Sequence, residues 1–316
     1  MVMLRLLLLV MLPLNQISGA SEDATREILS LIETGNKAFD RSDYSQCEKA
    51  FFDAANLSSH NKMFGLELQA QFGLLKVYTS QKKYKLAESL CFDQMKKIKT
   101  RGGELHRLVE VMVELGIVKT EEGKLIEAES ILNKARLLAE KNDIGTSFKS
   151  QPLVALAALN VQKNQFSKAA ALDERALEMV ESNNFDFINR AATVECLAEI
   201  YEKLGKKQRL EELFKDTIQN YETNNKNEQL GIARIYGDYG TLLSKSDRLQ
   251  EAEEYYQKAI AVFDKFNDFG VRSTSCRKNY ANLLRSQNRR DEAQQIEEVL
   301  IRAAIRQKIL QERGGQ

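Results

Sequence analysis

The chain has 316 residues, of which 43% are hydrophobic and 29% are charged, so it is long enough and apolar enough to bury a core. Its formal net charge is +1, and without the first twenty residues, which hold one Arg and no acid, it carries 45 basic and 45 acidic groups. This balance excludes a bulk electrostatic attraction to nucleic acid or to an anionic membrane. Two prolines, sixteen glycines and no Trp favour helix over strand throughout.

The N-terminal stretch MVMLRLLLLVMLPLNQISGA has the pattern of a secretory signal peptide. Arg5 is the positive region, residues 6–14 form a nine-residue apolar run, and Ser18 and Ala20 fit the small-x-small cleavage pattern. Nine residues are too few to cross ~30 Å of hydrocarbon as a helix, which argues against a membrane anchor. We therefore expect cleavage after Ala20 and an exported protein, either periplasmic or secreted, with no stable membrane insertion afterwards.

Seven similar segments follow one another along the rest of the chain. They align on positions 47, 87, 128, 169, 210, 252 and 293, called anchors below, with spacings of 40 to 42 residues. In six copies a small residue stands twelve positions before the anchor: Gly35, Gly116, Ala157, Ala198, Gly240 and Ala281. In five copies an apolar residue stands three positions before it: Tyr44, Tyr84, Leu125, Phe166 and Leu249. Small residues let two helices approach closely, and the larger ones fill the seam.

Polar turns such as TEEGKL and SKSDRL divide each copy into two helices joined by a short turn. The predicted copies span residues 28–61, 68–101, 109–142, 150–183, 191–224, 233–266 and 274–303, within a repeat domain of residues 21–303. One helix pair cannot bury its apolar face alone, so the pairs are predicted to stack into an α-solenoid. By composition, the weakest junction in this stack is KNDIGTSFKSQ, residues 141–151.

These features resemble the tetratricopeptide repeat, in the small residue of its first helix, the aromatic after the turn and the two alanines of its second helix. The period of about 41 residues exceeds the usual ~34, so the sequence is more similar to the longer repeats of kinesin light chains. The stretch KNYANLLRSQNRRDEA, residues 278–293, carries this similarity. The family's Trp in the first helix and its closing Pro are absent. The resemblance implies an all-α, right-handed solenoid that serves as a protein-interaction scaffold.

The C-terminal end is predicted to be one long helix. Residues 290 to 312 contain no Pro or Gly, and Ile296, Leu300 and Ile309 contribute to an apolar stripe at helical spacing. Gly314 and Gly315 end the pattern. Terminal repeats need a cap with a polar outer side, so the helix and the extension at residues 304–316 are predicted to cap the solenoid.

No assembled catalytic or metal-binding motif is found in the sequence. The two histidines, His60 and His106, have no His or Cys at metal-ligand spacing, and no GxSxG, HExxH or glycine-rich phosphate loop occurs. We therefore predict a protein that is not an enzyme and has no cofactor. The four cysteines are Cys47, Cys91, Cys196 and Cys276. Their irregular spacing favours small buried hydrophobes over two disulfides.

The first helices of the last three copies are predicted to line a partner-binding groove. Side chains at i, i+4 and i+7 share one side of a helix. If the small residue of each first helix is numbered position 8, as in the tetratricopeptide repeat, the resemblance implies that positions 5, 9 and 12 face the concave side. They are Glu195, Glu199 and Glu202 in copy five, Gly237, Thr241 and Ser244 in copy six, and Lys278, Asn282 and Arg285 in copy seven, with Arg234 near the rim. This predicts a trough with an acidic wall, a floor of small residues and a basic wall. A solvated surface with chance charges is the alternative.

Two functions are compatible with these patterns. The first is a scaffold that binds an extended peptide or a partner helix in the concave groove of an exported solenoid. The second is an extracytoplasmic sensor of a small molecule or signal peptide that changes the curvature of the solenoid on binding. A compact polar pocket in the groove would favour the sensor. In both cases the expected partner is a protein, a peptide or a small molecule rather than nucleic acid.

Overall fold

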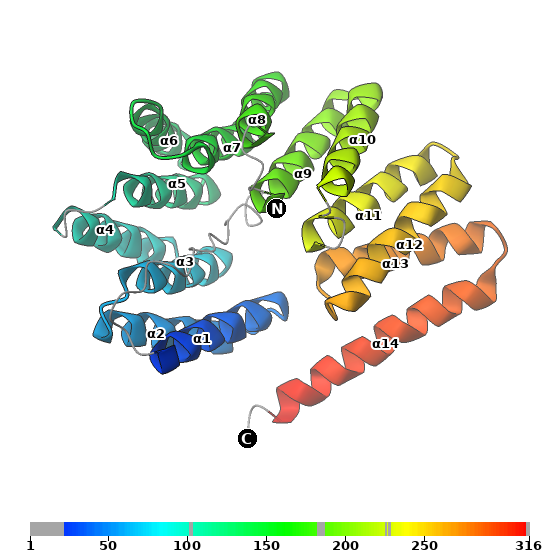
Figure 1. Ribbon diagram of the computed structural model, residues 1–316, viewed down its shortest axis with the longest axis horizontal. Helices are drawn as coiled ribbons and strands as arrows, with labels where there is room; N and C mark the ends of the chain where they lie inside the picture. The colour runs from blue at the N-terminus through cyan, green and yellow to red at the C-terminus, as the bar shows by residue number, and fades with distance from the viewer. Residues whose placement is uncertain (1–21, 101–103, 182–186, 225, 227–228, 314–316) are drawn as a thin grey trace. The chain divides into compact units, whose positions relative to one another are not determined.

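The structure is a computed structural model that describes residues 22–100, 104–181, 187–224, 226 and 229–313 (Figure 1). The predicted signal peptide, residues 1–20, lies outside this part of the chain. Every regular element in the described residues is an α-helix, as predicted. The helices are α1 (Glu22–Asp40), α2 (Tyr44–His60), α3 (Phe64–Ser80), α4 (Tyr84–Thr100), α5 (Leu105–Glu121), α6 (Leu125–Glu140), α7 (Thr146–Gln162), α8 (Phe166–Glu181), α9 (Phe187–Leu204), α10 (Lys207–Thr223), α11 (Leu230–Lys245), α12 (Leu249–Lys265), α13 (Val271–Ser286) and α14 (Arg290–Arg313).

Consecutive helices form pairs, and each predicted copy overlaps one pair. The helix pairs begin earlier than the predicted copies: α5 starts at Leu105 and α7 at Thr146, four residues before 109 and 150. Four residues add about one helical turn to the first helix. The long period of the repeat is therefore accommodated by longer helices rather than by longer turns. The turn between α3 and α4, for example, consists of residues 81–83.

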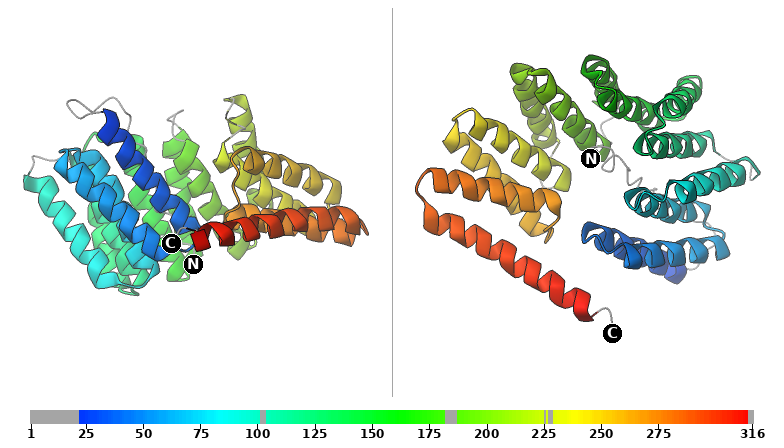
Figure 2. Two further views of the ribbon diagram at one scale, coloured as in Figure 1. Left: turned by 90° about the horizontal axis from the view of Figure 1, so that it is seen from below. Right: turned by 180° about the vertical axis from the view of Figure 1, so that it is seen from behind.

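The chain divides into two compact units, residues 1–200 and residues 201–316, with the boundary inside α9. In the first unit α1, α3, α5 and α7 contact one another in succession and form one layer, against which α2, α4, α6 and α8 pack (Figures 1 and 2). In the second unit α11 contacts both α12 and α13, and α13 contacts α14. The boundary therefore lies away from residues 141–151, where composition had predicted the weakest junction.

The core of the first unit lies between successive helices rather than at one centre. Phe51 of α2, Leu75 of α3, Leu132 of α6 and Leu159 of α7 are all 0–1% exposed. They belong to three clusters of buried residues that follow the chain. Stability is therefore distributed along the stack, as expected for a repeat protein.

The small residue of the first helix lies against the second helix of the same copy, as the repeat pattern predicts. A Cβ atom placed on Gly35 would meet the Phe51 ring at 2.7 Å, and one on Gly240 would meet the Tyr256 ring at 3.1 Å. Both rings are 1% exposed. A larger side chain at either glycine would force the two helices apart.

The turn inside each helix pair has the same backbone geometry in all seven copies. Five residues before each anchor, one residue adopts the left-handed conformation, with φ between 57° and 86°. These residues are Ser42, Lys82, Gly123, Asn164, Gly205, Asp247 and Asn288. The next N–H then bonds back to the preceding helix, as Lys83 does to the Tyr78 carbonyl at 2.8 Å. This closes the first helix and turns the chain into the second.

A glutamate one residue after the anchor forms an ion pair with the following copy at five junctions. The pairs are Glu48–Lys83 at 3.6 Å, Glu88–Lys124 at 3.9 Å, Glu129–Lys163 at 2.6 Å, Glu211–Arg248 at 2.6 Å and Glu253–Arg289 at 2.6 Å. In the fourth copy this position is Ala170, which has no charge. The boundary between the two units falls in the copy that follows Ala170.

Helix α14 confirms the predicted long C-terminal helix, but its outer side is not polar. Ile301, Ile305 and Ile309 are 57%, 53% and 43% exposed and share one face at four-residue spacing. Helix α14 packs against α13, and one neighbouring helix covers only one of its faces. Ile309, which was predicted to lie in the buried apolar stripe, is instead on this exposed face. The prediction of a polar outer surface is therefore wrong at these three isoleucines.

The four cysteines are free thiols, of which Cys47, Cys91 and Cys276 are buried and Cys196 is half-buried. Burial raises the pKa of the Cys276 thiol to about 12, so it stays protonated. These cysteines act as small core residues, as predicted. None of the described helices combines the length and the apolar character needed to span a membrane.

Replacement of Gly123 by alanine tests the shared turn geometry. Gly123 has φ of +86°, and an added Cβ would meet no atom within 4 Å, so the change acts on backbone conformation alone. We expect the free energy of unfolding to fall by about 1 kcal/mol, measured by urea denaturation of the full chain. Lys82→Gly, at the same place in another turn, should leave stability unchanged or raise it. An equally stable Gly123→Ala protein would contradict the role of the left-handed residue.

Candidate protein-interaction surfaces

The ten predicted groove residues lie on α9, α11 and α13, which are the first helices of their pairs. Glu195 and Glu199 belong to the first unit, and the other eight belong to the second. Glu202, Lys278, Asn282 and Arg285 are exposed; Glu195, Glu199, Arg234, Thr241 and Ser244 are half-buried; Gly237 is buried. Partner binding by these residues stays a prediction. The four exposed residues all lie in the second unit, where a partner could reach their side chains.

The predicted floor of small residues serves the packing of the second unit. The Thr241 hydroxyl donates to the Gly237 carbonyl at 2.9 Å and is 3.1 Å from the Tyr256 hydroxyl. It also accepts from the amide nitrogen of Asn279 at 3.2 Å. An added Cβ on Gly237 would lie 3.1 Å from Cys276 Sγ. Gly237 and Thr241 therefore join α11 to α12 and α13.

Two of the predicted wall charges have partners within the second unit. Glu202 lies 3.1 Å from the ammonium of Lys245, and Arg285 lies 2.6 Å from the carboxylate of Glu297 on α14. All four side chains are about one-third or more exposed, and such surface pairs contribute roughly 0–1 kcal/mol. A partner of complementary charge could replace these contacts at little cost.

The buried acids of the first unit include two neighbours on α5 that the sequence analysis did not single out. Glu110 and Glu114 lie one turn apart on α5 and are 8% and 9% exposed. Burial raises the pKa of Glu110 to about 7 and that of Glu114 to about 8, opposed by Arg107 and by Lys76 of α3 respectively. The valines and Leu115 on both sides of these acids in LVEVMVELG are the only signal of their burial in the sequence.

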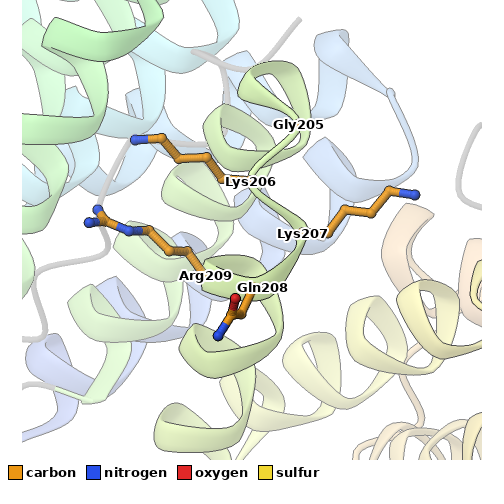
Figure 3. A pocket seen from close by; sticks show the side chains of 5 residues that line it. All are labelled: Gly205, Lys206, Lys207, Gln208 and Arg209. Carbon is orange, nitrogen blue, oxygen red and sulfur yellow. The ribbon is translucent and has the colours of Figure 1, made fainter.

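The turn between α9 and α10 forms a pocket of about 430 Å³, lined by residues 205–209. In Figure 3 the side chains of Lys206 and Arg209 extend to the same side of the turn, and Lys207 extends to the opposite side. The Lys206 ammonium lies 5.7 Å from the centre of the Tyr201 ring. The pocket is therefore cationic and lies next to the N-terminus of α10, whose dipole also favours an anion.

Neither histidine nor the acids form a recognisable metal site in the described residues. No group of three or more His, Cys, Asp or Glu side chains is placed to share a metal ion there. His106 stacks on Phe148 with ring centres 4.6 Å apart, and burial lowers its pKa. His106 is therefore an uncharged packing residue near neutral pH.

The comparison with protein families identifies the repeat directly. Residues 189–265, which cover α9 to α12, match the tetratricopeptide repeat. The chain contains tetratricopeptide repeats. No curated protein sequence matches the chain.

Solved structures share the fold of these tetratricopeptide repeats. BtubC (BKLC) from P. vanneervenii has a TM-score of 0.62 and 17% identity, over 71% of this chain and 92% of that one. The nearly identical repeats of a putative kinesin light chain from Podosopora anserina have a TM-score of 0.50 and 18% identity, over 65% and 98%. The apo form of RapI has a TM-score of 0.58 and 12% identity, over 88% and 77%. The predicted similarity to long, kinesin light chain-like repeats is confirmed at the level of fold.

Replacement of Glu114 by glutamine should change how stability depends on pH. The folded-state pKa of about 8 lies above the ordinary 4.5, so the carboxyl stabilises the fold fully below pH 4.5 and loses this effect as pH rises through 8. We expect Glu114→Gln to raise the free energy of unfolding at pH 8 by a few kcal/mol and to change it little at pH 5. Urea denaturation at the two pH values measures this, with the exposed Glu27→Gln as control. Equal effects at both pH values would contradict the buried acid.

Proposed function

We propose that this tetratricopeptide repeat protein is a non-catalytic scaffold that binds an extended peptide or a partner helix along its first helices. The observation that carries the proposal is the contact of α1, α3, α5 and α7 in succession, which gives the first unit one continuous surface formed by the first helices of its first four copies. Solenoids of stacked helix pairs use such surfaces to bind extended polypeptides.

In the second unit, the exposed side chains of α13 support the proposal that the partner is charged. Lys278, Asn282 and Arg285 are exposed on one side of this helix, and Glu202 is exposed at the end of α9. A polypeptide of mixed charge would pair with both signs, and the electrostatic part of its binding would weaken with added salt. We propose that Glu202 and the bases of α13 contact the same class of partner.

We also propose that the protein acts outside the cytoplasm. The support is the N-terminal sequence, with its positive residue, short apolar run and small residues before position 21. Expression in the native host, followed by N-terminal sequencing of the mature protein, should return a chain that begins at Ser21. A protein that retains Met1 in the cytoplasmic fraction would contradict export and would leave the binding proposal standing.

The double charge reversal Glu195→Lys with Glu199→Lys tests the groove. We expect capture of the native partner from a host extract to fall about fivefold or more at low salt, where charges are least screened. The measurement is quantitative pull-down, with circular dichroism to verify the helical fold.

The matched control is Glu212→Lys with Asp216→Lys, which makes the same charge change at the same spacing on the exposed side of α10. This control should retain partner capture because α10 is the second helix of its pair. If the Glu195 and Glu199 variant keeps its fold and captures the partner as well as the control does, these acids are not part of the binding surface.

A further inference from the structure

The end of the second unit carries a row of exposed isoleucines on α14. Ile301, Ile305 and Ile309 share one face of this helix, and all three are exposed. Ile301, eight residues after the last anchor, is 57% exposed, whereas Ala55 and Ile218 at the same distance in the first and fifth copies are 7% and 5% exposed. The fold buries this position in those two copies but leaves it in solvent on α14, the last described helix. A row of exposed apolar side chains indicates an interaction surface.

The charges of α14 are divided between the two halves of the helix. Residues 290–300 hold four acids and one base, and residues 301–313 hold four bases and one acid. The net charges of the two halves are therefore −3 and +3. The helix dipole favours acids in the first turn and bases in the last turn. It does not account for Glu298 and Arg302, which lie near the middle of this 24-residue helix.

Two α14 helices that run in opposite directions complement each other in both charge and apolar surface. The acidic half of each copy then lies beside the basic half of the other, and the isoleucines near the middle of the two helices face one another across a two-fold axis. A parallel pair would place acids beside acids and bases beside bases, which is destabilising. The charge pattern therefore favours a second copy of this chain, in antiparallel orientation, as the occupant of the exposed face.

The contact of α14 with α13 lies elsewhere on the helix and stays intact in such a pair (Figure 1). Ala293 of α14 is fully buried, and Glu297 pairs with Arg285 of α13 at 2.6 Å. Glu298 lies 3.4 Å from Arg302 on its own helix, and an exposed pair of this kind contributes little to stability. A second copy can therefore engage Glu298 and Arg302 without opening the packing between α13 and α14.

We propose that the exposed face of α14 is a self-association surface, through which two copies of this chain form an antiparallel dimer with two-fold symmetry. The isoleucines supply the apolar centre of the interface, and the two oppositely charged halves set its direction. The inference goes beyond the proposed function. Such a dimer carries two copies of the proposed binding surface and can hold one partner at two points, which raises the overall affinity without any new contact.

Sedimentation equilibrium of the mature protein, from low to high micromolar concentration, tests the association. The wild-type protein should change from monomer to dimer over this range. Ile301→Gln with Ile305→Gln should weaken the dimer about a hundredfold or more, because both apolar side chains lose their burial. The control Ile126→Gln with Leu137→Gln removes two exposed apolar side chains from α6 and should leave association unchanged. A wild-type protein that stays monomeric, or an α14 isoleucine variant that still dimerises, would overturn the proposal.

Charge reversal tests the antiparallel direction. Asp291→Lys with Glu298→Lys makes the first half of α14 net basic, and Arg302→Glu with Arg306→Glu makes the second half net acidic. Each variant alone should dimerise about tenfold or more weakly because like charges then face each other, and added salt should partly restore its dimer. An equimolar mixture of the two variants should form mixed dimers, because opposite charges face each other again.

The matched control for charge is Glu212→Lys with Asp216→Lys on the exposed side of α10, which should leave the dimer intact. Circular dichroism verifies the helical fold of every variant. If each α14 charge variant dimerises by itself as the wild type does, or if the two fail to associate when mixed, the antiparallel pairing is wrong. None of these results bears on the first helices, so the scaffold proposal stands or falls by its own partner-capture experiment.

Discussion

The close contact between the two helices of each pair is the constraint on which the rest of this structure depends. It exists because Gly35 and Gly240 leave room for the rings of Phe51 and Tyr256, which are almost fully buried. A pair closed in this way still has an apolar face that it cannot bury alone. Stacking of the next pair covers that face, and in the first unit stacking also brings α1, α3, α5 and α7 into one layer. The proposed binding surface is a consequence of this packing.

The glutamates that bridge successive copies have a different role from the core. Their ion pairs are largely at the surface, where one pair contributes roughly 0–1 kcal/mol, so they contribute little to stability compared with buried side chains such as Leu132 and Leu159. Their interest lies in their regularity. The same tyrosine–cation–glutamate geometry recurs at three junctions between successive copies.

Buried ionisable side chains distinguish individual copies of this regular repeat. Arg277 of α13, in the last copy, is 1% exposed. Its guanidinium stacks on Phe269, with 4.8 Å to the ring centre, and pairs with Asp264 at 2.6 Å, so the buried cation has both an aromatic and an acidic neighbour. Glu114 is instead kept protonated near neutral pH by burial, which makes the first unit sensitive to pH. Substitutions of this kind alter one copy without disturbing the pairing of its helices.

The sequence by itself determined the helix pairs, their number and their turns, because these depend on local rules. Helical periodicity, the small residue twelve positions before each anchor and the polar turn all act within about forty residues, and the long helix from Arg290 follows from the same rules. The tertiary structure alone decided what surrounds each side chain. In the folded chain Glu114 is buried, and Thr241 takes part in the contacts among α11, α12 and α13. Ile301 and Ile305 are exposed on α14. The boundary of the two units lies in α9 rather than at residues 141–151. Burial and pairing depend on residues that are distant in sequence, and a periodic pattern shows which face of a helix is apolar but not which neighbour covers it.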